Sequence, residues 1–155
     1  MNTRDGAGRR RARIEALALA AVLVGSPLVA CGQGGGTLAL GAVFPLHGPQ
    51  APLATQELLG ARLAADLVNR QGGVAGKRIS LVVRDLETRQ GAATAVGSLE
   101  RAGVPAVLGA YSFQLSIPAA AATSRAGLVY WEAGAVADQV TGQGSPLVFR
   151  VGASG

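Results

Sequence analysis

Residues 37–85 read TLALGAVFPLHGPQAPLATQELLGARLAADLVNRQGGVAGKRISLVVRD, and this stretch decides the fold class of the chain. It opens with a continuous apolar run over residues 37–44, which is typical of a strand buried on both faces, and Pro45 ends that run. A second apolar run covers residues 79–83 and ends at Arg84-Asp85. The two runs predict two buried strands.

The segment between these strands has the period of a helix. Leu59, Leu63 and Leu67 recur every four residues, so we expect them to form the buried face of an amphipathic helix that ends at Gly72-Gly73. The expected buried face also includes Ala64 and Val68, and the expected polar face holds Glu57, Arg62, Asp66 and Arg70. Strand, helix and strand in this order make one unit of an α/β fold.

The same alternation continues to the end of the chain. A second helix is expected after an N-cap at Thr88, and a third from near Ser116, because Pro118 is tolerated in a first helical turn. The second helix is expected to bury Ala92, Val96, Leu99 and Ala102. Further strands are expected over residues 106–109, 128–131 and 147–151, and a short helical turn within residues 136–141. Short glycine-ended links favour right-handed crossovers. The sequence therefore predicts an α/β fold, a doubly wound parallel sheet with helices on both faces.

Length and composition limit the classes of protein that remain. A chain of 155 residues allows one ordinary domain or one lobe of a larger protein. Charged residues make up 15% and apolar residues 49%, which argues against a disordered chain. A single cysteine and a single histidine exclude an internal disulfide framework, a Cys-cluster metal site and a multi-histidine metal site.

The basic charge is concentrated in the first thirty residues. Five arginines there face two acidic residues, which accounts for +3 of the net charge of +5. No basic stripe with interleaved aromatic residues follows, so we expect no nucleic-acid partner.

The N-terminal residues have the pattern of an export signal. A basic segment ends at Arg13, an apolar stretch follows, and residues 28–31 read Leu-Val-Ala-Cys. This quartet resembles the lipobox of bacterial lipoproteins, in which the cysteine is lipidated. We therefore expect a signal peptide over residues 1–30, a lipidated Cys31 and a flexible tether to residue 36, which would anchor the protein on the outer side of the cytoplasmic membrane. A plain secretory signal with an incidental cysteine is the alternative.

The loops that follow the strands are the expected ligand site, because open parallel sheets bind ligands beyond the carboxyl ends of their strands. In this chain those loops are residues 45–48, 85–87, 110–113 and 132–134. The chain has no P-loop, no dinucleotide fingerprint after a strand and no nucleophile elbow, so we expect a binding protein without a cofactor, a metal or a catalytic residue.

Five ordered stretches of the chain resemble one family. They are residues 41–48, 60–64 leading to 69–76, 81–85, 107–112 and 148–150. Together they resemble the substrate-binding proteins of branched-chain-amino-acid-type ABC importers, which have the type I periplasmic binding fold. The resemblance implies a receptor that passes an amino acid or related small polar solute to an ABC permease. It also implies two lobes, of which residues 37–155 would be an incomplete N-terminal one.

The resemblance also implies where the ligand lies: at His47, Tyr111, Ser112, Phe113, Glu132 and Gly134. Three of these depart from the family. His47 stands where a threonine is usual, and Phe113 where a serine contacts the ligand, so either Ser112 substitutes or the ligand differs from a simple amino acid. Glu132 replaces a small residue, and either pairs with a cationic group or is a solvated loop charge. A ligand-sensing domain of the same fold is the alternative function, and an extracytoplasmic α/β enzyme is the weakest.

Overall fold

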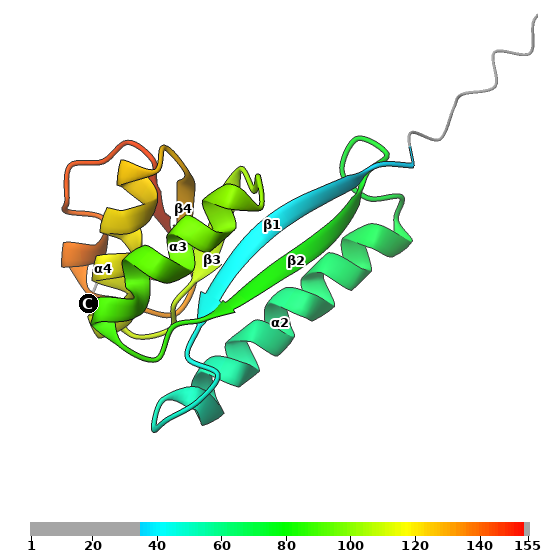
Figure 1. The fold of residues 1–155 in the computed structure, drawn as a ribbon. Helices are drawn as coiled ribbons and strands as arrows, with labels where there is room; N and C mark the ends of the chain where they lie inside the picture. Colours follow the sequence, from blue (N-terminus) through cyan, green and yellow to red (C-terminus); the bar gives the residue numbers. More distant parts are fainter. Residues whose placement is uncertain (1–34, 154–155) are drawn as a thin grey trace, which may run out of the picture. The chain divides into compact units, whose positions relative to one another are not determined.

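The computed structural model describes residues 35–153, which form one sheet with helices on both faces (Figure 1). The strands are β1 (Thr37–Phe44), β2 (Arg78–Asp85), β3 (Ala106–Gly109), β4 (Val129–Glu132) and β5 (Val148–Arg150). The helices are α2 (Ala51–Arg70), α3 (Ala92–Arg101) and α4 (Phe113–Arg125), with short 3-10 turns η1 (Arg89–Gly91) and η2 (Asp138–Val140). The strand order is β2-β1-β3-β4-β5 and every pairing is parallel, which confirms the predicted doubly wound α/β fold.

Side chains alternate across β1 and so build a core on each face of the sheet. Val43 belongs to the larger core, which also contains the buried residues of α3 and α4. Ala42 and Phe44 point the other way and pack with Ala54 and Leu58 of α2. Figure 1 shows α2 lying along β1 and β2, and α3 beside α4.

The predicted buried face of the first helix is wrong. Leu59, Leu63 and Leu67 are 48%, 56% and 48% exposed, whereas the buried residues of α2 are Ala54, Leu58 and Ala65. The helix packs its alanine-rich side on the sheet, because small side chains let a helix approach strands closely. Its leucine side is left uncovered by the described residues.

The third helix begins earlier than predicted. Ser112 is its N-cap, because the Ser112 carbonyl accepts hydrogen bonds from the N–H groups of Leu115 (3.0 Å) and Ser116 (2.8 Å). Pro118 therefore lies inside α4 instead of in its first turn. Because proline has no backbone N–H, α4 lacks one of its internal backbone hydrogen bonds at this residue.

Two smaller expectations about the second helix also differ from the structure. Ala102 follows α3 as its C-cap and is exposed, whereas Ala92, Val96 and Leu99 are buried as predicted. Thr88 precedes the turn η1, and its side chain makes no capping hydrogen bond. The predicted signal peptide and Cys31 lie outside the described residues. Within residues 35–153, no helix has the length and apolar character needed to cross a bilayer.

Candidate functional site

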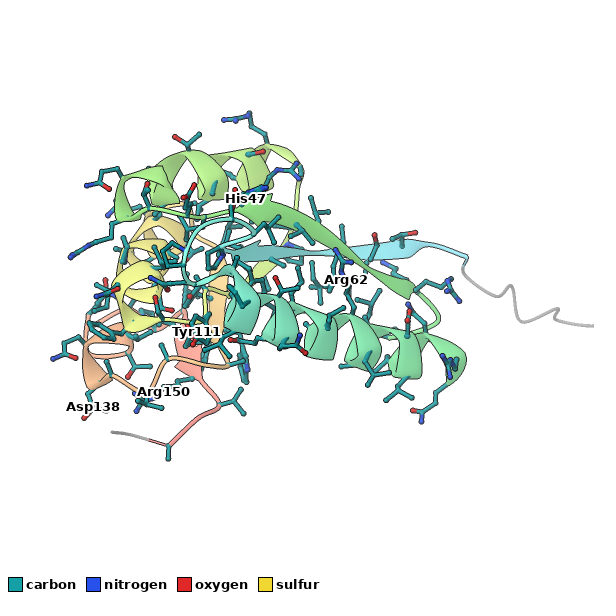
Figure 2. All side chains as sticks on the ribbon, turned by 90° about the horizontal axis from the view of Figure 1, so that it is seen from below. His47, Arg62, Tyr111, Asp138 and Arg150 are labelled. Carbon is teal, nitrogen blue, oxygen red and sulfur yellow. The ribbon has the colours of Figure 1, made fainter. Side chains whose placement is uncertain are left out.

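The order of the strands places the candidate site beyond the carboxyl ends of β1 and β3. From β1 the chain passes to β2 on one side, and from β2 it crosses back to β3 on the other side of β1. The loops after β1 and β3 therefore diverge from a topological switch point, where open α/β sheets leave a crevice for ligands. His47 and Tyr111 come from these two loops, and both are labelled in Figure 2. The Gln50 side-chain amide donates to Gln114 Oε1 over 3.4 Å and so joins the N-cap of α2 to the first turn of α4.

His47 is exposed and held by an acidic residue from the neighbouring strand. Its Nδ1 lies 2.7 Å from Asp85 Oδ2, and the Leu46 N–H donates to Asp85 Oδ1 over 2.8 Å. The hydrogen bond to Asp85 and the charge of that carboxylate raise the pKa of His47. Desolvation acts to raise the pKa of Asp85, but the hydrogen bonds from Leu46 and His47 outweigh it and lower that pKa. The pair therefore fixes the first loop to the end of β2.

The loop after β3 has a backbone conformation that the sequence did not indicate. Tyr111 has a φ of 86°, which is uncommon for a residue with a side chain and which concentrates at functional sites. Gly109 is required here, because a Cβ at this position would collide with the Val43 carbonyl oxygen. The end of β3 therefore lies very close to β1, directly before the loop that carries Tyr111.

Ser112 combines two features of an anion site. Its Oγ is buried and has no hydrogen-bond partner among the described residues, although Ser112 caps α4. The first N–H groups of a helix lack intrahelical partners, and those of Leu115 and Ser116 already use the Ser112 carbonyl. The Ser112 hydroxyl and the N–H groups of Phe113 and Gln114 can therefore donate hydrogen bonds to one carboxylate. Phe113 is 51% exposed beside them.

Glu132 contradicts one of the two expectations about it. The side chain is 0% exposed, so the expectation of a solvated loop charge is wrong. Oε1 accepts hydrogen bonds from the N–H groups of Gly134 (2.9 Å) and Ala135 (2.8 Å). Oε2 accepts from the Ala110 N–H (3.0 Å) and the Tyr130 hydroxyl (2.8 Å). Both oxygens are thus already engaged within the lobe.

The loop after β4 is tied to β5 by a second ion pair. Arg150 donates to Asp138 Oδ1 over 2.9 Å and to the Val136 carbonyl, and Figure 2 shows Asp138 and Arg150 close together. Gly134 lies in the same loop, at its approach to the loop after β3. A Cβ on Gly134 would meet the Tyr111 carbonyl oxygen at 3.0 Å and would collide with Glu57 Oε2. The loops of Tyr111 and Gly134 therefore lie against each other.

Glu57 is the residue near this site that sequence reasoning missed. The helical period assigned it to the polar face of α2, but it is half-buried and its Oε1 has no hydrogen-bond partner among the described residues. Desolvation, with a smaller contribution from the charge of Glu132, raises the pKa of Glu57 to about 7. No sequence signal marks such a residue, because its burial depends on which side of α2 meets the sheet.

A cavity lies beside α2, between that helix and the sheet. Its volume is about 520 Å³, and Glu57 is the only charged residue that lines it. The apolar lining includes Gly60, Ala61 and Ala64 of α2 and Leu108, Trp131 and Val151 on the sheet side. Among the described residues, α2 is the one helix on this face, so the cavity marks a part of the sheet that they leave uncovered. No group of three or more potential metal ligands occurs in residues 35–153.

Comparison with known proteins places the chain in one family. Residues 37–155 match the family described as periplasmic binding protein. Leu/Ile/Val-binding protein homolog 8 of Brucella abortus is 37% identical over 111 residues, which are 71% of this chain and 28% of that protein. Leu/Ile/Val-binding protein homolog 7 of Brucella melitensis is 32% identical over 136 residues, 87% of this chain and 33% of that protein. The chain thus spans about a third or less of the length of these relatives.

A solved structure agrees with this match. The branched-chain amino acid transporter substrate-binding protein LivJ of Streptococcus pneumoniae, in complex with isoleucine, superposes with a TM-score of 0.71 at 30% identity. The match covers 76% of this chain and 34% of LivJ.

Proposed function

The chain belongs to the periplasmic binding protein family, and from this premise we propose that it is the ligand-binding lobe of an extracytoplasmic receptor. The receptor delivers an amino acid or a related small polar solute to an ABC importer. The names of the relatives support this ligand class, since they are Leu/Ile/Val-binding protein homologues and a structure with bound isoleucine. These comparisons favour transport over the alternative of a sensor of the same fold.

The observation that carries the proposal is the hydroxyl of Ser112, which has no hydrogen-bond partner within residues 35–153. It is buried at the N-terminus of α4, at the point where the strand order reverses. In the proposed site, the Ser112 hydroxyl and the first N–H groups of α4 donate hydrogen bonds to the ligand carboxylate, and Tyr111 and Phe113 cover the apolar part of the ligand. His47 and Gly134 border the same crevice from the neighbouring loops. Binding and closure of the receptor are the whole of its activity, with no chemical step.

Two further parts of the proposal extend beyond the described residues. A second lobe closes over these loops, consistent with relatives about three to four times as long as their match to this chain. Cys31 carries the lipid that holds the receptor on the outer side of the cytoplasmic membrane, next to its permease.

The test measures solute binding by calorimetry on a receptor completed with its second lobe. Leucine, isoleucine and valine are titrated, with the corresponding amines that lack the carboxylate as controls. We expect the amino acids to bind and the amines not to bind. Ser112→Ala should weaken binding by about 1.5–3 kcal/mol, the contribution of a hydrogen bond to a charged group. Unchanged affinity in Ser112→Ala would move the carboxylate site to another loop, and absence of any amino acid binding would contradict the proposed ligand class.

A further inference from the structure

Glu132 connects three separate parts of the lobe through one buried carboxylate. Its four donors are the N–H groups of Ala110, Gly134 and Ala135 and the hydroxyl of Tyr130, at 2.8–3.0 Å. Ala110 lies in the loop after β3, Gly134 and Ala135 lie in the loop after β4, and Tyr130 lies on β4 itself. The two loops connected in this way are those that the proposed function assigns to the ligand.

The carboxylate is suited to hold these loops and unsuited to bind a ligand directly. A buried charge is tolerated only when hydrogen bonds replace its lost hydration, and here each oxygen accepts two. The Ala110 N–H also lies 3.2 Å from Ser116 Oγ, which gives the same amide a second acceptor. The charge of Glu132 also acts on a carboxyl group of α2, that of Glu57, and contributes to its raised pKa.

We infer that Glu132 is a positioning residue, which keeps the loops at residues 110–112 and 133–135 in the arrangement that binds solute without touching the solute. The inference rests on the proposed function for the identity of the loops. The carboxylate acts by preorganisation: the loops meet the ligand already ordered, so binding loses less conformational entropy. A residue that only stabilised β4 would affect unfolding and leave affinity unchanged.

The hydrogen bonds can be tested on the chain itself, with no ligand. In the unaltered protein, NMR should detect scalar couplings across hydrogen bonds from the amides of Ala110, Gly134 and Ala135 to the Glu132 side-chain carboxyl carbon. In Glu132→Gln, hydrogen exchange at these amides should accelerate by about tenfold or more, while the amide of Val43 in β1 stays protected. Absence of the couplings, or equal acceleration at Val43, would overturn the inference even if the variant folds poorly.

The matched control is Tyr130→Phe, which removes a hydrogen bond to the same carboxylate but none to a loop. It should leave the exchange of Ala110, Gly134 and Ala135 unchanged. In the two-lobe receptor, Glu132→Gln should weaken the binding of isoleucine by about tenfold or more, and Tyr130→Phe by less than about twofold at a comparable loss of Tm. If the loss of isoleucine affinity in each variant is proportional to its loss of Tm, the positioning role is overturned. A receptor that binds no amino acid would contradict the proposed function, while the exchange data would still decide whether Glu132 holds the loops.

Discussion

His47 Nδ1 lies 2.7 Å from Asp85 Oδ2, so the loop after β1 is joined to the end of β2 next to the candidate crevice. The hydrogen bond and the charge of Asp85 raise the pKa of His47 above 6.5, and the pKa of Asp85 is lowered below 3.8. The charged pair therefore stabilises the fold most between pH 3.8 and pH 6.5. The stabilisation that comes from charged His47 is lost as the pH rises through the raised pKa of His47. The stabilisation that comes from charged Asp85 is lost as the pH falls through the lowered pKa of Asp85.

The first prediction concerns the titration of His47. Because it is the single histidine of the chain, its ring proton signals in NMR belong to one residue. The midpoint of the titration should lie above 6.5 in the unaltered protein and return toward 6.5 in Asp85→Asn, which lacks the carboxylate charge. A midpoint that Asp85→Asn leaves unchanged would show that the pair does not form in solution.

The second prediction concerns Glu57 and the pH dependence of stability. Its pKa in the folded lobe is about 7 against 4.5 for the free side chain, so the folded state binds the proton more tightly. The contribution of Glu57 to the free energy of unfolding is therefore most favourable below pH 4.5 and declines as the pH rises through 7. Glu57→Gln keeps a neutral side chain of the same shape, and should be more stable than the parent at pH 8 but not at pH 5.

Urea unfolding at pH 5 and pH 8 measures this difference. Glu100→Gln, an exposed position on α3, provides the matched control and should retain the pH dependence of the parent. Equal pH dependence in the parent and in Glu57→Gln would contradict the prediction.

The sequence predicts the strands of this lobe more accurately than its helix faces or its buried charges. The run at residues 37–44 and the run at 106–109 coincide with β1 and β3, because a strand buried on both faces must be apolar throughout. A helix offers several possible faces, and the leucine period of α2 selected the wrong one. The alanine side packs on the sheet, a choice that depends on interlayer spacing and not on hydrophobicity alone.

The candidate site was predictable only in part, for a related reason. Loops at strand ends follow from the topology, so residues 110–113 could be placed near the crevice from the sequence. The burial of Glu132 could not be predicted, because its donors come from β4 itself, from the loop after β4 and from the loop after β3. The role of Glu57 was missed because it depends on the orientation of α2.

The third prediction separates the core of the sheet from the site. Val107 on β3 is 0% exposed, and Val107→Ala should lower the free energy of unfolding by about 2 kcal/mol, because it leaves a cavity in close-packed surroundings. Ser112→Ala removes a hydroxyl that makes no hydrogen bond in the part of the chain that the structure describes, and should leave unfolding nearly unchanged. Thermal unfolding of the two variants checks this. A large loss of Tm in Ser112→Ala would indicate that the hydroxyl supports the fold instead of the ligand.

The fourth prediction concerns Cys31, which lies outside the described residues. If the quartet at residues 28–31 is a lipobox, Cys31→Ser should abolish lipid attachment and release the protein from the membrane fraction of the producing cells. Labelling with a palmitate analogue and fractionation measure the two effects. Labelling that survives the substitution would rule out lipidation at this cysteine and favour a plain secretory signal.

The last prediction concerns the apolar surface beside α2 that residues 35–153 leave uncovered. Ala64 lines the cavity of about 520 Å³ and is itself exposed, and Trp131 on the opposite wall is stacked on Phe149 with ring centroids 5.3 Å apart. Apolar surface of this extent promotes association in water. The chain of 155 residues should therefore associate as its concentration rises, as measured by analytical ultracentrifugation in detergent-free buffer. Ala64→Lys, which places a charge in the cavity wall, should reduce this association. Ala93→Lys makes the same change at an exposed position of α3, on the other face, and should not. A chain that stays monomeric at all concentrations, or equal association in the two variants, would show that this surface does not drive self-association.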